Sequence, residues 1–95
     1  MALTGKIALV TSGGSGLGKA SALKLAAEGA DIALLSRTME EVDAVALEIN
    51  RLGRKALPLY ADISDVADMQ AAFDQITETF GRLDFAFANA GINGT

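Results

Sequence analysis

The segment VTSGGSGLGKA, residues 10–20, holds four glycines within six positions, between a short apolar run and a longer segment of helical character. A chain that turns from a strand into a helix exposes the first unpaired N–H groups of the helix, where the helix dipole adds about half a positive charge. Glycines let such a turn be tight and let a phosphate approach the backbone closely. The segment therefore predicts a diphosphate-binding turn between a strand and a helix.

The spacing of the glycines narrows the class of site. A G-x-G-x-x-G pattern that begins with Gly14 and Gly16 would need a glycine at Lys19, and the sequence has no Gly-Lys-Ser/Thr of the Walker type. A glycine-rich turn without a ligand is the alternative interpretation. The position between a strand and a helix favours ligand binding.

Outward from this turn, short apolar runs alternate with longer segments of helical period. The runs at 6–11, 30–36, 55–61 and 82–88 are predicted strands. A first helix is expected over 16–28, apolar on more than one side and therefore the most buried of the helices. A second helix is expected to begin with a capping box of Thr38 and Glu41 and to end at Gly53, and a third to begin at Ser64 or Asp65 and to end at Gly81. The apolar positions of these two helices are Met39, Val42, Val45, Ile49 and Leu52, then Val66, Met69, Phe73, Ile76 and Phe80.

Strands of nearly continuous apolar character, joined by helices, are typical of a parallel sheet that is covered on both faces. We therefore predict a doubly wound α/β fold, Rossmann-like, with strand order 3-2-1-4. Pro58 lies within the third strand, and it fits the edge position that this order gives that strand. Residues 1–95 are expected to form the dinucleotide-binding half of a single domain that continues beyond residue 95.

Composition excludes several classes of function. The chain of 95 residues contains neither cysteine nor histidine, so disulfides, thiol catalysis and the commonest metal ligands are excluded. A net charge of −4 with interspersed signs argues against nucleic acid as a partner. No apolar stretch approaches transmembrane length, and we expect a cytoplasmic protein without a membrane partner. The apolar share of 51% indicates apolar surface that awaits further structure.

The glycine segment resembles the T-G-x-x-x-G-x-G motif of the short-chain dehydrogenase/reductase family, with one departure at Ser12, where the family usually has its first glycine. The resemblance extends through SRT (36–38), ADISD (61–65) and FANAGI (87–92), in the family's order and spacing. It implies that the turn binds the cofactor diphosphate through Ser12, Gly14, Ser15, Gly16, Leu17 and Gly18. A serine at position 12 either adopts a negative φ or is strained, and its hydroxyl can instead contact phosphate.

The residue after the second strand bears on the choice of nicotinamide cofactor. NAD enzymes of this architecture place a carboxylate there for the ribose hydroxyls, whereas a nearby arginine receives the 2′-phosphate of NADP. Ser36 and Arg37 occupy this place, so we predict NADP(H) in preference to NAD(H). A solvated arginine at the start of a helix is the alternative.

Two further segments are candidate cofactor contacts by resemblance. Asp62 and Ile63 follow the third strand, and the matching aspartate of the family accepts a hydrogen bond from the adenine amino group; a turn or N-cap carboxylate is the alternative role, and both roles can hold together. The family's N-A-G segment, which closes over the cofactor ribose, corresponds to Asn89, Ala90 and Gly91, although Ala88 replaces the asparagine often found before it. Lys19 and Lys24 are interpreted as solvated, and Met39 and Met69 as core residues.

Catalysis in the family uses a Tyr-x-x-x-Lys pair and a serine that lie beyond the N-A-G segment. The single tyrosine here, Tyr60, has Ser64 four residues on, and we interpret it as a packing residue. We therefore assign no catalytic residue to the 95 residues and expect them to be inactive alone. The leading hypothesis is an NADP(H)-dependent carbonyl reductase or alcohol dehydrogenase, a homodimer or homotetramer by resemblance, with a small-molecule substrate. The alternatives are a non-catalytic nucleotide-binding or interaction module and, more remotely, a methyltransferase, which would need an acid near Ser36.

Overall fold

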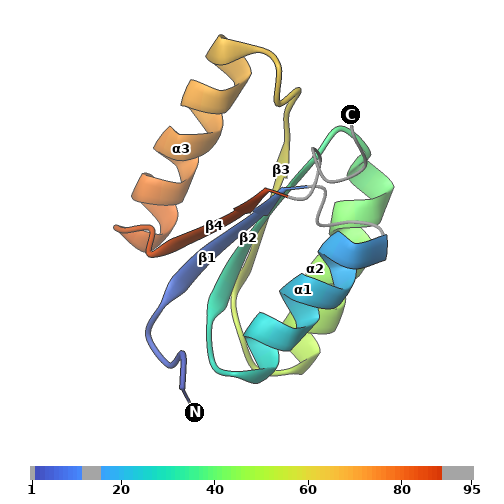
Figure 1. Cartoon of the computed structure of the whole chain (residues 1–95), viewed down its shortest axis with the longest axis vertical. Helices are drawn as coiled ribbons and strands as arrows, with labels where there is room; N and C mark the ends of the chain where they lie inside the picture. Colours follow the sequence, from blue (N-terminus) through green and yellow to red (C-terminus); the bar gives the residue numbers. More distant parts are fainter. Residues whose placement is uncertain (1, 12–15, 89–95) are drawn as a thin grey trace.

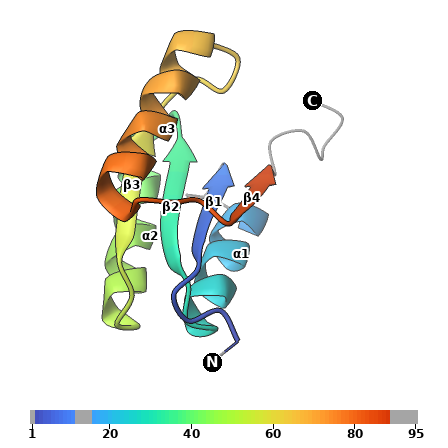
Figure 2. The same ribbon diagram turned by 90° about the vertical axis from the view of Figure 1, so that its left-hand side faces the viewer.

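The computed structural model describes residues 2–11 and 16–88, which form a three-layer α/β fold (Figure 1). The elements follow in strict alternation: β1 (Ile7–Thr11), α1 (Gly16–Ala27), β2 (Asp31–Ser36), α2 (Met39–Arg51), β3 (Ala56–Tyr60), α3 (Val66–Phe80) and β4 (Phe85–Ala88). The strands pair in parallel in the order β3-β2-β1-β4, with α1 and α2 on one face of the sheet and α3 on the other (Figures 1 and 2). The predicted fold class, strand order and edge position of Pro58 are confirmed.

The two inner strands are buried on both faces, which explains their continuous apolar sequence. Alternate residues of β1 and β2 point to opposite sides, so Val10 and Leu34 contribute to one core cluster and Leu9 and Leu35 to the other. The first cluster lies under α1 and α2 and includes Ala22, Ala26, Val42, Val45 and Ile49. The second lies under α3 and includes Leu59, Ala72 and Ile76. These two cores fix the sheet between the helix layers.

The ends of the helices agree only in part with the sequence prediction. Asp65 is the N-cap of α3, where its side chain accepts a hydrogen bond from the backbone N–H of Asp68 at 3.0 Å. The predicted capping box of α2 is wrong, because the Thr38 side chain makes no capping hydrogen bond. The backbone N–H of Thr38 instead donates to Ser36 Oγ at 3.1 Å, so the turn after β2 is closed by the preceding serine.

The expected burial of the helices also needs correction. Helix α1 is apolar on more than one side in sequence, but Ala20 and Ala27 are exposed and its buried residues Gly18, Ala22 and Ala26 form one stripe. Met39 is not a core residue, since it begins α2 outside the buried stripe that starts at Val42.

The apolar face of α3 is narrower than its spacing predicts. Ala72 and Ile76 are buried, with Met69 and Phe80 partly buried beside them, whereas Phe73 is exposed. Val66 is 84% exposed because it occupies the first position of the helix, away from the stripe that contacts the sheet.

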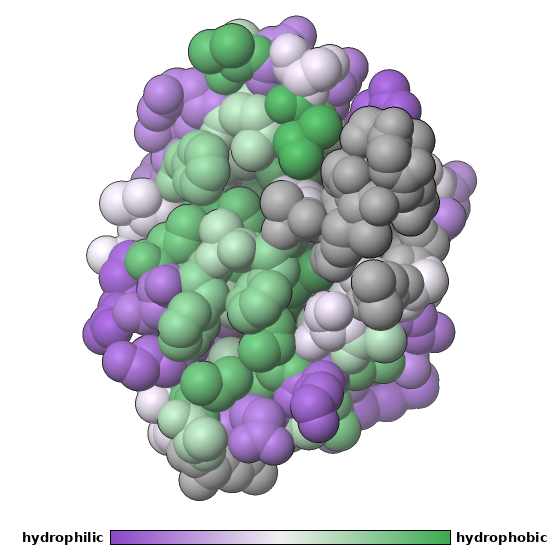
Figure 3. Space-filling view, viewed as in Figure 1, coloured by the Kyte–Doolittle hydropathy of each residue, from purple (hydrophilic) through white to green (hydrophobic). Residues whose placement is uncertain are grey.

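Strand β4 leaves apolar side chains open to solvent. Within residues 2–11 and 16–88 no strand pairs with its outer edge, and Phe85 and Phe87 are 37% and 40% exposed. Their rings lie 6.4 Å apart on one face of the strand. Figure 3 shows a continuous apolar area in the middle of the molecular face that carries β4. This open surface agrees with the apolar excess of the sequence.

Candidate cofactor site

All four strands end at the same edge of the sheet, because they are parallel and in register. Thr11 is level with Leu35 and with Ala88, and Ser36 is level with Tyr60. The Oγ1 of Thr11 donates a hydrogen bond to the backbone carbonyl of Phe87 at 3.2 Å, which joins the ends of β1 and β4. The carboxyl ends of the strands therefore lie side by side, as expected for a ligand site at this edge of an open sheet (Figure 2).

The glycine segment enters this edge from β1. Gly16 begins α1 with φ +50°, a conformation that side chains rarely adopt, and a Cβ built on it would meet no atom of residues 2–11 and 16–88 within 4 Å. Among these residues nothing blocks the approach of a phosphate to Gly16. Gly18 is buried within α1. Ser12, Gly14 and Ser15, like Asn89, Ala90 and Gly91, lie outside the described residues, and Leu17 is described only by its place in α1.

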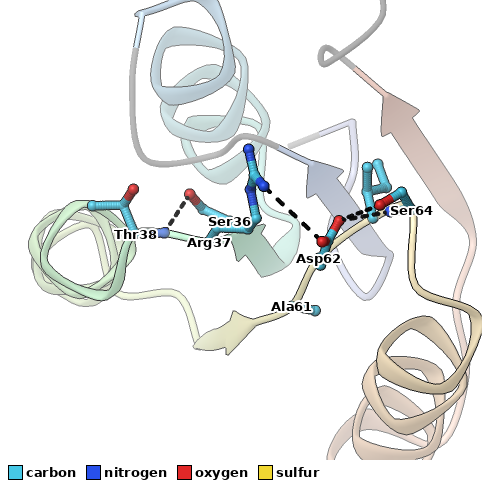
Figure 4. Close-up of a pocket in the computed structure, with 7 residues that line it drawn as sticks. Ser36, Arg37, Thr38, Ala61, Asp62 and Ser64 are labelled. Carbon is cyan, nitrogen blue, oxygen red and sulfur yellow. Dashed lines mark hydrogen bonds and ion pairs between the residues drawn. The ribbon is translucent and has the colours of Figure 1, made fainter.

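A pocket of about 390 Å³ opens between the ends of β2 and β3 (Figure 4). This volume is within the range of small-molecule sites, roughly 300–1,000 Å³. The structure brings the predicted residues Arg37, Asp62 and Ile63 together here. The full lining consists of Ser36, Arg37 and Thr38 from the turn after β2, and Ala61, Asp62, Ile63 and Ser64 from the turn after β3.

Arg37 reaches across the pocket toward Asp62. Its Nη1 lies 4.0 Å from Asp62 Oδ2, and its side chain is 77% exposed (Figure 4). An exposed ion pair at this distance stabilises weakly, so the guanidinium remains available to an incoming anion. The turn after β2 itself supplies two hydroxyl residues and this cation but no carboxylate.

Asp62 is held in a defined orientation by the turn that contains it. Its Oδ1 accepts hydrogen bonds from the backbone N–H of Ser64 at 2.9 Å and from Ser64 Oγ at 2.7 Å. Its backbone N–H donates to Asp68 Oδ2 at 2.9 Å. The Ser64 hydroxyl, then the Ser64 N–H and Arg37, lower the pKa of the Asp62 carboxyl below its usual value. The alternative role of Asp62 as a turn carboxylate is thus confirmed, whereas its contact with adenine stays a prediction.

Tyr60 differs from the packing role that its sequence position indicated. The residue is exposed, and its hydroxyl donates a hydrogen bond to Asp43 Oδ1 on α2 at 2.6 Å. This hydrogen bond, together with the charges of Asp43 and Glu40, raises the pKa of Tyr60. A tyrosine kept protonated in this way is poorly suited to acid–base catalysis at neutral pH.

Other candidate groups at the surface take no part in the pocket. Lys19 pairs with Glu48 at 3.2 Å and Lys24 is exposed, as expected of solvated residues. The part of the chain that the structure describes contains no group of three or more His, Cys, Asp or Glu side chains placed to hold a metal ion. Nor does it contain a helix long and apolar enough to cross a membrane.

Sequence reasoning identified the charged residues of the pocket and missed the two serines that shape it. The sequence predicts Ser64 as a possible N-cap and Ser36 as the residue in place of an acid, and neither as a hydrogen-bond partner within its turn. The signal for both was available, because serine or aspartate two residues before a backbone N–H commonly closes a turn.

Comparison with known proteins identifies the family of the chain. A family model described as short chain dehydrogenase matches residues 6–95. The curated relative (-)-trans-carveol dehydrogenase from Rhodococcus erythropolis is 39% identical over 100 residues, which cover 93% of this chain and 36% of the relative. The chain thus spans little more than a third of the length of that relative.

Two solved structures share the fold over the same part. An NAD⁺-bound xylitol dehydrogenase is 34% identical, with a TM-score of 0.92 over 96% of this chain and 35% of that one. A metagenomic short-chain oxidoreductase in complex with NADP is 32% identical, with a TM-score of 0.85 over 90% of this chain and 39% of that one. By sequence match and by fold, the chain belongs to the short-chain dehydrogenase family.

Proposed function

We propose that this chain is the cofactor-binding half of an NADP(H)-dependent oxidoreductase, which transfers hydride between the nicotinamide and a carbonyl or alcohol carbon of a small molecule. The observation that carries the cofactor choice is the position of Arg37, which extends over the pocket at the carboxyl end of β2. The catalytic residues of such an enzyme would lie outside the 95 residues. A cytoplasmic location and a homodimer or homotetramer remain part of the proposal.

Family membership alone does not choose between the two cofactors. One similar structure holds NAD⁺ and another holds NADP. The choice rests on the turn after β2, where Ser36 and Thr38 offer no carboxylate for a ribose 2′-hydroxyl and Arg37 offers a charge for a 2′-phosphate. A charge-assisted hydrogen bond contributes about 1.5–3 kcal/mol, which corresponds to roughly tenfold or more in binding.

The remaining contacts follow the length of the dinucleotide. The diphosphate would lie at the start of α1, held by the turn from Ser12 to Gly18, with Gly16 providing the open approach described above. Adenine would lie in the pocket between β2 and β3, with Ile63 as an apolar contact and Asp62 beside it. Asn89, Ala90 and Gly91 would contact the ribose of the cofactor.

The relatives give no support to a non-catalytic module, since the similar proteins named above are dehydrogenases and an oxidoreductase. A methyltransferase is disfavoured by the match to the dehydrogenase family and by the serine at position 36.

The proposal is tested by titrating the natural full-length protein with NADPH and with NADH, following the fluorescence of the reduced nicotinamide. The dissociation constant for NADPH should be lower by about tenfold or more. Equal affinities, or tighter binding of NADH, would contradict the cofactor assignment. Absence of binding by either cofactor would contradict the site itself.

A further inference from the structure

The carboxylate of Asp62 faces two partners at once. One oxygen is held by Ser64, and the other is the nearest anion to Arg37 among the residues that line the pocket. We propose that Asp62 limits the cofactor preference, because it competes with the 2′-phosphate of NADP(H) for the Arg37 guanidinium. This inference rests on the proposed function, since it requires that Arg37 binds the 2′-phosphate.

Asp62 and Arg37 differ in how many hydrogen bonds hold them in place. Asp62 is fixed on three sides: its Oδ1 accepts two hydrogen bonds from Ser64, and its backbone N–H donates to Asp68 Oδ2 at 2.9 Å. The hydrogen bonds to Oδ1 leave Oδ2 directed at Arg37, 4.0 Å from Nη1 (Figure 4). Arg37 is 77% exposed, and within residues 2–11 and 16–88 its side chain makes one ion pair, to Asp62, and no recorded hydrogen bond. The carboxylate of Asp62, held by these hydrogen bonds, therefore attracts the exposed guanidinium of Arg37 to its own side of the pocket.

A bound 2′-phosphate would meet this arrangement in two ways. It would have to draw Arg37 away from Asp62, and it would bring a charge of about −1.5 to −2 near a second anion. Two unit charges about 4 Å apart in water change a binding constant by roughly fivefold, and salt reduces the effect. NAD(H) has no 2′-phosphate and would experience neither effect. Asp62 is thus expected to weaken NADP(H) binding selectively.

This expectation has the opposite sign to the role implied by family resemblance. If Asp62 only accepted a hydrogen bond from adenine, its replacement would weaken both cofactors alike, since both contain adenine. Competition for Arg37 predicts that neutralising the carboxylate tightens NADP(H). The two roles are therefore separable by measuring both cofactors on one variant.

The test is the Asp62→Asn variant of the full-length protein, titrated with NADPH and NADH by nicotinamide fluorescence. Asparagine retains an oxygen that can accept the hydrogen bonds from Ser64 and loses the charge. The NADPH dissociation constant should fall by about three- to tenfold, while that for NADH changes by less than about twofold. Retained NADH binding shows that the variant is folded. Asp74→Asn, which removes an exposed carboxylate of α3 that hydrogen-bonds only Gln70, is the matched control and should change neither constant.

The same substitution in an Arg37→Ala background separates competition from direct repulsion. If Asp62 acts through Arg37 in addition to direct repulsion, the gain in NADPH binding from Asp62→Asn should be clearly smaller once Arg37 is absent. An equal gain in both backgrounds would overturn the competition. If wild type prefers NADPH but Asp62→Asn binds NADPH no more tightly than wild type, the competition is also overturned. The proposed function would stand in that case. A wild type without NADPH preference would instead contradict the proposed function, and this inference with it.

Discussion

The carboxylate of Asp84 accepts a hydrogen bond from the backbone N–H of Ile7, with 2.8 Å between Oδ2 and N, across 77 positions of sequence. The backbone N–H of Asp84 in turn donates to the carbonyl of Ile7 at 2.9 Å. This reciprocal pair joins the starts of β1 and β4, so both strands enter the sheet in fixed register. Their other ends, at Thr11 and Ala88, consequently meet at the edge that carries the candidate site.

Asp84 should make the stability of the protein depend on pH in the acid range. Arg82, and then the Ile7 N–H, lower the pKa of the Asp84 carboxyl below 3.8, its usual value. A group whose pKa is lower in the folded state stabilises the fold above the unfolded pKa, and the contribution is lost as pH falls through the folded pKa. The free energies of unfolding of wild type and Asp84→Asn in urea should therefore differ most near neutral pH and converge as pH falls through the folded pKa, which lies below 3.8.

The control for this series is Asp74→Asn, which removes an exposed carboxylate that accepts a hydrogen bond from Gln70 on the same helix. The difference in free energy of unfolding between Asp74→Asn and wild type should be the same at every pH of the series. A difference between wild type and Asp84→Asn that stays constant down to the lowest pH would show that charge on Asp84 does not stabilise the junction of β1 and β4.

A substitution at Leu34 tests the position of the core between β2 and α2. The residue is completely buried in the centre of β2, under the stripe of α2 that contains Val42 and Val45. Leu34→Ala should lower the free energy of unfolding by about 2–5 kcal/mol. Leu47→Ala makes the same chemical change on the outer face of α2, where the side chain is 60% exposed, and should change it by about 0.5 kcal/mol or less. Similar losses for the two variants in urea unfolding would contradict the packing of α2.

Gly29 permits a close contact between the start of the chain and the end of α1. It has φ +106°, and a Cβ at this position would lie 2.8 Å from Thr4 Oγ1 and 3.0 Å from the Thr4 backbone nitrogen. Gly29→Ala should therefore combine backbone strain with a steric clash and destabilise by about 2–4 kcal/mol. Gly53→Ala, at φ +83° with nothing within 4 Å of the added Cβ, carries the strain alone and should destabilise by about 1 kcal/mol. Equal effects in thermal or urea unfolding would mean that Thr4 does not pack against this turn.

The sequence predicted the sheet well because the required pattern repeats. Strands buried on both faces, such as Asp31–Ser36, have nearly continuous apolar sequence, and each is followed by a helix that ends at a glycine. Proline in Ala56–Tyr60 adds an independent sign of an edge strand. These constraints act over whole elements, so individual exceptions do not disturb them.

Side-chain contacts at the ends of elements were less predictable, because they depend on the geometry of single turns. Thr38 occupies the N-cap position of α2, yet its side chain makes no capping hydrogen bond, and Ser36 Oγ accepts the Thr38 N–H that Glu41 would accept in a capping box. Val66 continues the apolar spacing of α3 but lies at the end of the helix, beyond the residues that contact the sheet.

In the pocket, too, the residues that line it were predictable from the sequence, whereas the contacts between their side chains were not. Arg37 is predicted from its place after the second strand and Asp62 from its place after the third strand together with the family resemblance, and the structure confirms that they line one pocket. Their separation of 4.0 Å, and the hydrogen bonds by which Ser64 orients Asp62, follow from the conformation of the turn after β3 and could not be inferred from residue order.

The most direct test of the central claim, that Arg37 selects NADP(H), is the ratio of the NADH and NADPH dissociation constants in Arg37→Ala. The matched control is Arg51→Ala, which removes an exposed arginine from the last turn of α2, away from the residues that line the pocket. Loss of Arg37 should reduce the ratio by about tenfold or more, through weaker binding of NADPH, while Arg51→Ala leaves it unchanged. A ratio in Arg37→Ala equal to that of wild type would contradict the account.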